Sequence, residues 1–245
     1  MDTLDEPVQK RNSWADRVQA LLEVVLVGGI VSSYIAFLPF YLRGGTEESL
    51  LRNVRLLAVM LLSEAAITVV LIALLLQLHR QTWRDLGWRL DRLKSNVGLG
   101  LAVVPMLFAA NIVVAALVRH YLPHFYTEHN PLIEGIQTRA DLALFLCAAV
   151  LAGGVKEELQ RAFILTRFRD HLGGTLVGLI LWSAAFGAGH YIQGVQGAIA
   201  AGLFGLLFGI VYLARASLVP PMVAHTVYDI AALLGYWFFR TAANP

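Results

Sequence analysis

The sequence has little charge and almost no cysteine. Charged residues make up 15% of its 245 positions and the formal net charge is +2, whereas soluble domains are near 25% charged. So small a positive balance does not imply a nucleic-acid partner, and we expect none. The single cysteine, Cys147, excludes an internal disulfide and lies in an apolar run, where we expect it to pack. Residues 1–18 carry both signs of charge, which is not the pattern of a cleavable signal peptide.

The sequence instead contains long apolar runs. Hydrophobic residues account for 58% of the chain and the mean hydropathy is +0.65. Because roughly 20 apolar residues cross a hydrocarbon core, the sequence predicts an all-α, polytopic transmembrane helical bundle with about seven spans. The predicted spans are residues 20–42, 54–78, 96–118, 141–165, 173–192, 196–214 and 218–239.

Residues 80–95 form a basic segment with two tryptophans. Such a stretch is typical of an interfacial amphipathic segment in contact with anionic membrane lipids, although a solvated connector has the same composition. This segment places more Lys and Arg on one side of the predicted bundle. The positive-inside rule then predicts an integral membrane protein with a cytoplasmic N-terminus, in the plasma or inner membrane if the source is prokaryotic.

A glutamate pair, Glu157 and Glu158, interrupts the apolar run 148–165. A charge at the centre of a membrane costs roughly 2.5–3.5 kcal/mol, so the pair needs a function or a partner. Arg161 lies four and three residues further along the helix, within reach of either carboxylate. We expect one glutamate to do chemistry while the other pairs with Arg161. The alternative is a cytosolic helix end at Lys156–Arg161 with a surface ion pair.

Two histidines and an aspartate occur in equally apolar predicted helices. His190 follows Gly187 and Gly189, small residues that permit close helix approach. His225 and Asp229 are four residues apart, which places them on one helix face. Taken alone, each is consistent with a packed histidine or a simple intrahelical hydrogen bond. On the predicted spans, His190 lies near the outer membrane surface and His225 in the inner half, although a common site requires them to meet.

Together these groups predict amide hydrolysis at a membrane-embedded site by one of two routes. Glu157, His190 and His225 match a catalytic zinc set that leaves one position open for water. Without a metal, a glutamate activates water as general base while other polar groups stabilise the oxyanion. The sequence leaves a divalent metal such as zinc and a metal-free site both open.

Three motifs in order resemble the CPBP family, the CAAX protease and bacteriocin-processing (Abi) membrane proteins, which include the type II CAAX prenyl endopeptidases. The family pattern is Glu-Glu-x-x-x-Arg, then Phe-x-x-x-His, then His-x-x-x-Asn or Asp. The resemblance covers roughly residues 140–235. Its elements here are Glu157 and Glu158 with Arg161, Phe186 with His190, and His225 with Asp229.

Two positions depart from that pattern. Arg161 comes three residues after the second glutamate instead of four, so an alignment on the arginine would place Lys156 at an acidic position. Alignment on the acidic pair keeps Glu157 and Glu158, and it is the one we prefer. Asp229 stands where prenyl endopeptidases usually have Asn. Since an ionised carboxylate cannot donate to an oxyanion, Asp229 better suits orienting His225 or binding a cation.

The resemblance implies an intramembrane endopeptidase whose catalytic set is Glu157, Glu158, Arg161, His190, His225 and Asp229. We expect one membrane domain, with N-terminal helices and the interfacial segment in residues 1–140 and the CPBP-like core in residues 141–239. The implied substrate is a peptide or protein with a hydrophobic or lipidated segment. The alternatives are a non-catalytic immunity or scaffold relative, and a proton- or ion-coupled transporter.

Overall fold

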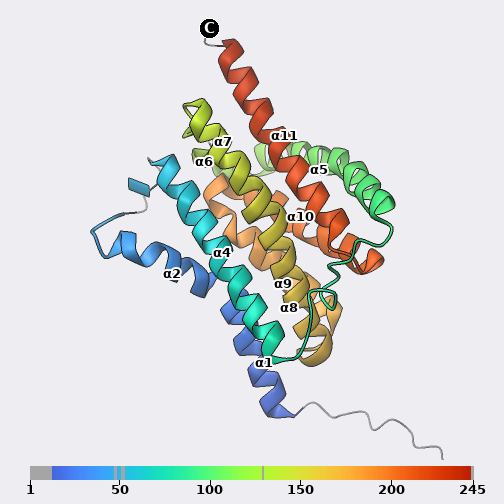
Figure 1. The fold of residues 1–245 in the computed structure, drawn as a ribbon. Helices are drawn as coiled ribbons and strands as arrows, with labels where there is room; N and C mark the ends of the chain where they lie inside the picture. The colour runs from blue at the N-terminus through green and yellow to red at the C-terminus, as the bar shows by residue number, and fades with distance from the viewer. Residues whose placement is uncertain (1–12, 47–48, 51–52, 129, 244–245) are drawn as a thin grey trace, which may run out of the picture.

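Every element assigned in the described part of the chain is a helix (Figure 1). The computed structural model describes residues 13–46, 49–50, 53–128 and 130–243. The predicted all-α bundle is therefore confirmed. In chain order the elements are α1 (Trp14–Val27), α2 (Ile30–Tyr41), α4 (Val54–Leu78), α5 (Leu93–Tyr121), η1 (Pro123–Phe125), α6 (Pro131–Glu134), α7 (Arg139–Ala148), η2 (Ala149–Glu157), α8 (Glu158–His171), α9 (Thr175–Gly189), η3 (Tyr191–Gln193), α10 (Gly194–Arg215) and α11 (Val219–Ala243).

In the described part of the chain, five helical segments are long and apolar enough to cross a membrane, and they coincide with five of the seven predicted spans. The predicted span 141–165 is also helical, but it extends over α7, η2 and part of α8, which contain many charged residues. The predicted span 173–192 is wrong at its boundaries, because α9 has 15 residues. At 1.5 Å per residue it is about 22 Å long, less than the ~30 Å hydrocarbon core. The five segments are Trp14–Tyr41, Val54–Leu78, Leu93–Tyr121, Tyr191–Arg215 and Val219–Arg240.

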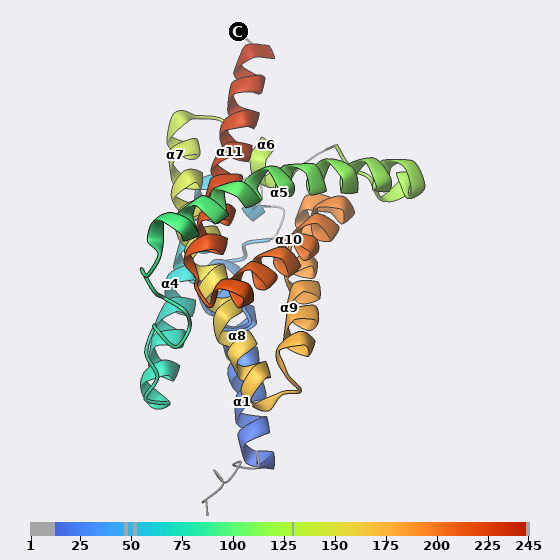
Figure 2. The same ribbon diagram turned by 90° about the vertical axis from the view of Figure 1, so that its right-hand side faces the viewer.

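The helices α7, η2 and α8 follow one another without a break and form the centre of the bundle (Figure 2). The π-helix η2 packs against α4 and against α11, while α8 packs against α1 and α9. The start of α7 is fixed by a capping box between Thr138 and Asp141. Asp141 also accepts a hydrogen bond from the Arg55 Nε at 2.6 Å, which ties α7 to α4.

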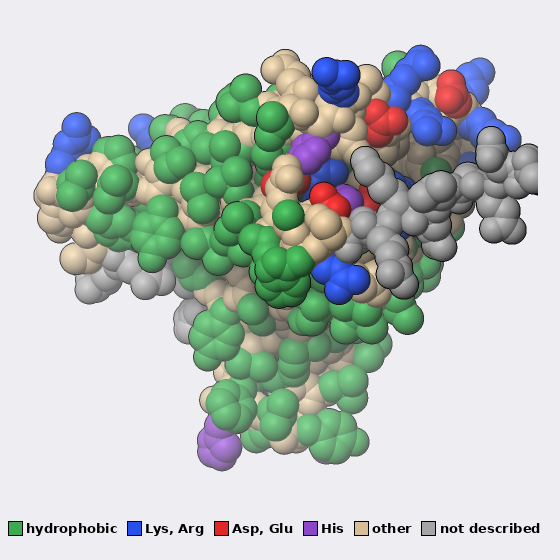
Figure 3. Space-filling view, turned by 90° about the horizontal axis from the view of Figure 1, so that it is seen from below, with side chains coloured by type: hydrophobic (Ala, Val, Ile, Leu, Met, Phe, Trp, Pro, Cys, Tyr) green, Lys and Arg blue, Asp and Glu red, His purple; other side chains and the backbone are tan. Residues whose placement is uncertain are grey.

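The outer surface of the bundle is largely apolar. Large apolar side chains that are about half or more exposed occur on several helices, as at Leu74, Ile112, Leu176 and Phe239. Figure 3 shows apolar side chains over most of one face, with Lys and Arg gathered toward one side. Such a surface suits lipid and marks an integral membrane protein. Cys147 is exposed on α7, so the prediction that it packs inside the bundle is wrong.

Residues 80–92 form a run of turns rather than a helix. Leu86 is buried, and the carbonyl of Gly87 accepts a hydrogen bond from the Leu218 amide at 3.0 Å. Gly87 has φ +84°, a backbone conformation that favours glycine. Asp85 accepts hydrogen bonds from the amide and hydroxyl of Thr82, which hold the pKa of its carboxyl below the ordinary value. The segment is thus packed onto the start of α11, and its place at a membrane surface stays a prediction.

Candidate active site

The glutamate pair lies at the junction of η2 and α8. The two carboxylates differ in burial and in their hydrogen-bond partners. Glu158 is 1% exposed. One of its oxygens accepts from Arg161 and the other lies 2.9 Å from the His225 Nδ1. The alternative reading of Lys156–Arg161 as an exposed helix end is wrong, because Lys156, Glu158 and Arg161 are buried. Glu158 is therefore the anchored member of the pair.

The side chain of Glu157 is 18% exposed and makes only longer contacts. Its Oε1 lies 3.7 Å from the Lys156 Nζ, and its Oε2 lies 3.7 Å from the His225 Nε2. The Oε2 atom is buried and makes no hydrogen bond to any group in the described part of the chain. Glu157 is thus the carboxylate with an oxygen still able to accept a proton.

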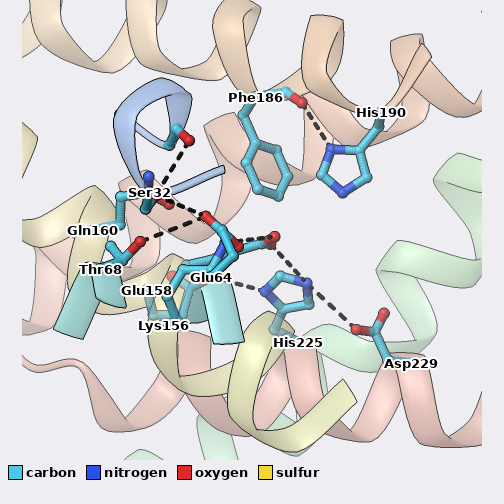
Figure 4. A network of polar contacts seen from close by, with 12 residues as sticks. Ser32, Glu64, Thr68, Lys156, Glu158, Gln160, Phe186, His190, His225 and Asp229 are labelled. Atoms are coloured by element: carbon cyan, nitrogen blue, oxygen red, sulfur yellow. Dashed lines mark hydrogen bonds and ion pairs between the residues drawn. The ribbon is translucent and has the colours of Figure 1, made fainter. Parts of the chain in front are cut away.

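His225 lies between carboxylates contributed by two helices (Figure 4). Its Nδ1 faces Glu158, whereas its Nε2 faces Glu157 at 3.7 Å and Asp229 at 3.6 Å. The predicted shared face of His225 and Asp229 on α11 is confirmed. Their separation exceeds a hydrogen-bond distance, so the contact is electrostatic rather than a bond that fixes the ring. The orientation of the His225 ring is instead fixed by the contact between its Nδ1 and Glu158.

His190 lies in the turn that follows α9, close to the same network (Figure 4). Its Nδ1 lies 2.8 Å from the carbonyl of Phe186. A carbonyl only accepts, so Nδ1 carries a proton and Nε2 is the nitrogen left for other partners. Asp229 interacts electrostatically with both His190 and His225. Because α9 ends at Gly189, His190 lies beside the polar network that contains His225 and Asp229 (Figure 4). The predicted difference in membrane depth between the two histidines stays a prediction.

Two aromatic rings enclose the polar centre. The Phe186 ring lies 4.5 Å from the His190 ring, and the Phe208 ring stacks on His225 at 4.9 Å. The Arg161 guanidinium lies 5.0 Å from the centre of the Phe186 ring and 5.3 Å from that of Phe208. Two of its buried nitrogens make no hydrogen bond to any described residue, and the guanidinium lies over the two ring faces. These contacts hold the Arg161 guanidinium beside the Glu158 carboxylate.

Glycines let α11 approach the central helix. A Cβ on Gly153 would lie 2.7 Å from the Asp229 Oδ2, and one on Gly154 would overlap the Thr226 hydroxyl. Gly187 likewise permits contact between α9 and α10, as predicted. A Cβ on Gly189 would meet nothing within 4 Å, so the same prediction is wrong there.

Gly154→Ala should push η2 and α11 apart and displace His225 from Glu157. Overpacking of this kind costs about 1–3 kcal/mol of stability, and a displacement near 1 Å can lower a rate about 10²-fold. The measurement is thermal unfolding in detergent together with the rate of any reaction found for the wild type. Gly98→Ala is the matched control, because a Cβ there meets nothing within 4 Å. Equal behaviour of the two variants would show that the close approach is unimportant.

Sequence reasoning missed two residues at the site. Glu64, in α4, lies 2.9 Å from the Lys156 Nζ and is buried. The energetic criterion that singled out Glu157 applies equally to a glutamate in the apolar run 54–78, so a signal for Glu64 existed. The sequence gives no signal that Phe208 lies at the site, because an aromatic residue in an apolar helix is usually part of the core.

The predicted zinc set is not a ready metal site as the side chains lie. Within the described ranges, no three His, Cys, Asp or Glu side chains are arranged to hold a metal ion. Within the set, His225 already faces carboxylates on both ring nitrogens. The side chains of Glu157, His190 and His225 are not arranged as three ligands of one ion. Metal assistance therefore stays a prediction, and no step below is routed through a metal.

Comparison with known proteins places part of the chain in the range of a family model. Residues 138–231 match the family model described as type II CAAX prenyl endopeptidase Rce1-like. No curated protein and no solved structure shows significant similarity to the chain. The matched residues include all six members of the predicted catalytic set, and they exclude α1, α2, α4 and α5.

Proposed function

Because residues 138–231 match the Rce1-like type II CAAX prenyl endopeptidase family model, we propose that this chain is an intramembrane endopeptidase in which Glu157 activates the attacking water. The observation that carries the proposal is the contrast between the two glutamates. Glu158 has both oxygens engaged, whereas Glu157 has a buried oxygen without a hydrogen bond beside His225. A general base needs such an oxygen.

The reaction follows from that arrangement. The Glu157 Oε2 takes a proton from water as the water oxygen bonds to the scissile carbonyl carbon, and the carbonyl oxygen becomes an oxyanion. The resulting Glu157 carboxyl group passes the proton to the departing nitrogen as the C–N bond breaks. One water is consumed, and a carboxylate and an amine are formed.

The neighbouring groups hold this machinery in place. Glu158 fixes the His225 ring through Nδ1, and Arg161 acts through Glu158 as a positioning residue. His190 presents its Nε2 from the end of α9 and is the group that we assign to orienting water or the substrate carbonyl. Asp229 faces the same side of His225 and cannot donate to an oxyanion when ionised. Its role is therefore electrostatic.

The substrate that we propose is a peptide with a hydrophobic or lipidated segment close to the scissile bond. The name of the matched family refers to prenyl substrates, and the apolar outer surface of the bundle suits a substrate chain partly dissolved in lipid. The N-terminus is proposed to be cytoplasmic, as the Lys and Arg distribution predicts.

The assay uses full-length protein in liposomes and a peptide ending in a prenylated Cys-a-a-X sequence. We expect a shorter product to be released, and a slower reaction with the same peptide lacking the prenyl group. Mass spectrometry of the products provides the measurement. Failure to cleave any prenylated or hydrophobic peptide in a broad panel would contradict the proposal and favour the non-catalytic scaffold. Substrate-driven ion flux without cleavage would favour the transporter.

A further inference from the structure

A buried ion pair next to the site has no part in the chemistry described so far. Lys156 and Glu64 are both almost completely buried, and the Lys156 Nζ lies 2.9 Å from the Glu64 Oε2. The other oxygen of Glu64 accepts from the Ser32 hydroxyl at 3.2 Å and the Thr68 hydroxyl at 3.4 Å (Figure 4). Glu64 is thus fully engaged by α2, α4 and η2, and Lys156 is held firmly at one end.

The same ammonium group faces the proposed base. Lys156 is adjacent to Glu157 in sequence, and its Nζ lies 3.7 Å from the Glu157 Oε1. The two oxygens of Glu157 therefore face different partners: Oε1 faces Lys156 and Oε2 faces His225. A cation on one side of a carboxylate fixes which oxygen points to the other side, because the attraction is strong where water is largely excluded.

We propose that Lys156, held by Glu64, is a positioning residue that keeps the Glu157 carboxylate directed at His225. The proposal rests on the function assigned to Glu157 above. The counter-charge that holds this lysine comes from Glu64 in α4. The proposal also gives the helices outside the matched region 138–231 a role in the site.

The charge balance of the site supports this role. Four carboxylates gather there, and Lys156 and Arg161 are their two permanent cations. Arg161 is committed to Glu158, so Lys156 is the permanent positive charge nearest Glu157 among the described residues. Without it, Glu157 would face Asp229 with no fixed cation beside either, and like charges repel each other. The four carboxylates belong to Glu64, Glu157, Glu158 and Asp229.

The break between α1 and α2 connects to the same network. The Ser32 hydroxyl oxygen also lies 3.1 Å from the carbonyl oxygen of Gly29, so its single hydrogen is shared between Gly29 and Glu64. The Gln160 side-chain amide donates to the carbonyl of Val27 at 2.5 Å. Gly29 has φ +99°, which allows the sharp turn. The N-terminal helices are therefore hydrogen-bonded to Gln160, which follows the glutamate pair, and to Glu64, the ion-pair partner of Lys156.

The test replaces both members of the pair with apolar residues, in Glu64→Leu with Lys156→Met. Removing one partner leaves a buried charge, but removing both is often neutral for stability. We expect the double variant to unfold at or above the wild-type temperature, with kcat lowered about tenfold to a hundredfold and KM unchanged. Lys156→Arg, which keeps the charge, should retain more activity than Lys156→Met.

A second buried pair provides the matched control. Arg167 and Glu23 are 2.6 Å apart and equally buried, and Arg167 lies nine residues beyond Glu158, about 13 Å along the helix. Glu23→Leu with Arg167→Met should leave kcat within about twofold of the wild type, since it does not touch the site. A folded Glu64/Lys156 double variant with wild-type kcat would overturn the positioning role.

A structural readout separates this proposal from the proposed function. If the wild type cleaves no peptide, the function fails, and crystal structures of the wild type and the double variant still decide the role of Lys156. We expect the Glu157 carboxylate to turn away from the His225 Nε2 in the double variant. An unchanged carboxylate would contradict the proposal even if the wild type is an active protease.

Discussion

Glu157→Gln should lower kcat about 10²–10⁴-fold, the usual contribution of a general base. Glutamine has nearly the same shape but cannot take a proton from water at its side-chain oxygen. The fold should survive, because Glu157 makes only 3.7 Å contacts and is partly exposed. The measurement is single-turnover cleavage of the substrate peptide, with unfolding temperature recorded on the same preparation.

The companion variant Glu158→Gln should behave differently. Glu158 is buried between Arg161 and His225, so its neutral replacement leaves the guanidinium without a counter-charge. We expect a lower unfolding temperature in addition to a loss of rate. If Glu158→Gln abolished cleavage without loss of stability while Glu157→Gln remained active, the roles assigned to the two carboxylates would be reversed.

Arg161→Met should destabilise the protein by about 3–5 kcal/mol, because it leaves the Glu158 carboxylate buried and unpaired. Domains are commonly stable by only 5–15 kcal/mol, so this is a large fraction of the total. The side chain of Arg161 is 1% exposed and also contacts two aromatic rings, which adds lost packing. Denaturant or thermal unfolding in mild detergent measures the effect.

Arg169→Met is the matched control for that variant. Arg169 pairs with Asp170 on the same helix, but its side chain is 59% exposed. Exposed ion pairs contribute about 0–1 kcal/mol, so this substitution should change stability little. Equal losses for the two arginine variants would show that the Arg161–Glu158 pair has no special structural importance.

Much of the site could be predicted from the sequence, because ionisable residues in apolar helices are costly and therefore conspicuous. The i, i+4 relation of His225 and Asp229 and the pairing of Arg161 with one glutamate follow from α-helical geometry. Which glutamate pairs could not be predicted. The π-helix η2 ends at Glu157, and its i→i+5 bonding changes the direction in which the following side chains point.

Other features depend on contacts between distant segments. The end of α9 at Gly189 places His190 beside α11, although an apolar run alone predicts a longer span. The pairing of Lys156 with Glu64 could not be predicted either, because Glu64 lies 92 positions earlier and no local pattern connects the two residues. Tertiary packing, rather than sequence spacing, decides both features.

Cleavage in water enriched in oxygen-18 tests the central claim most directly. With the liposome-bound protein and a prenylated peptide, the account predicts that the new C-terminal carboxylate contains one heavy oxygen from solvent. It also predicts that Glu157→Gln, folded and at the same concentration, forms this product about 10²-fold more slowly or less. A Glu157→Gln variant that forms the labelled product at the wild-type rate would contradict the account.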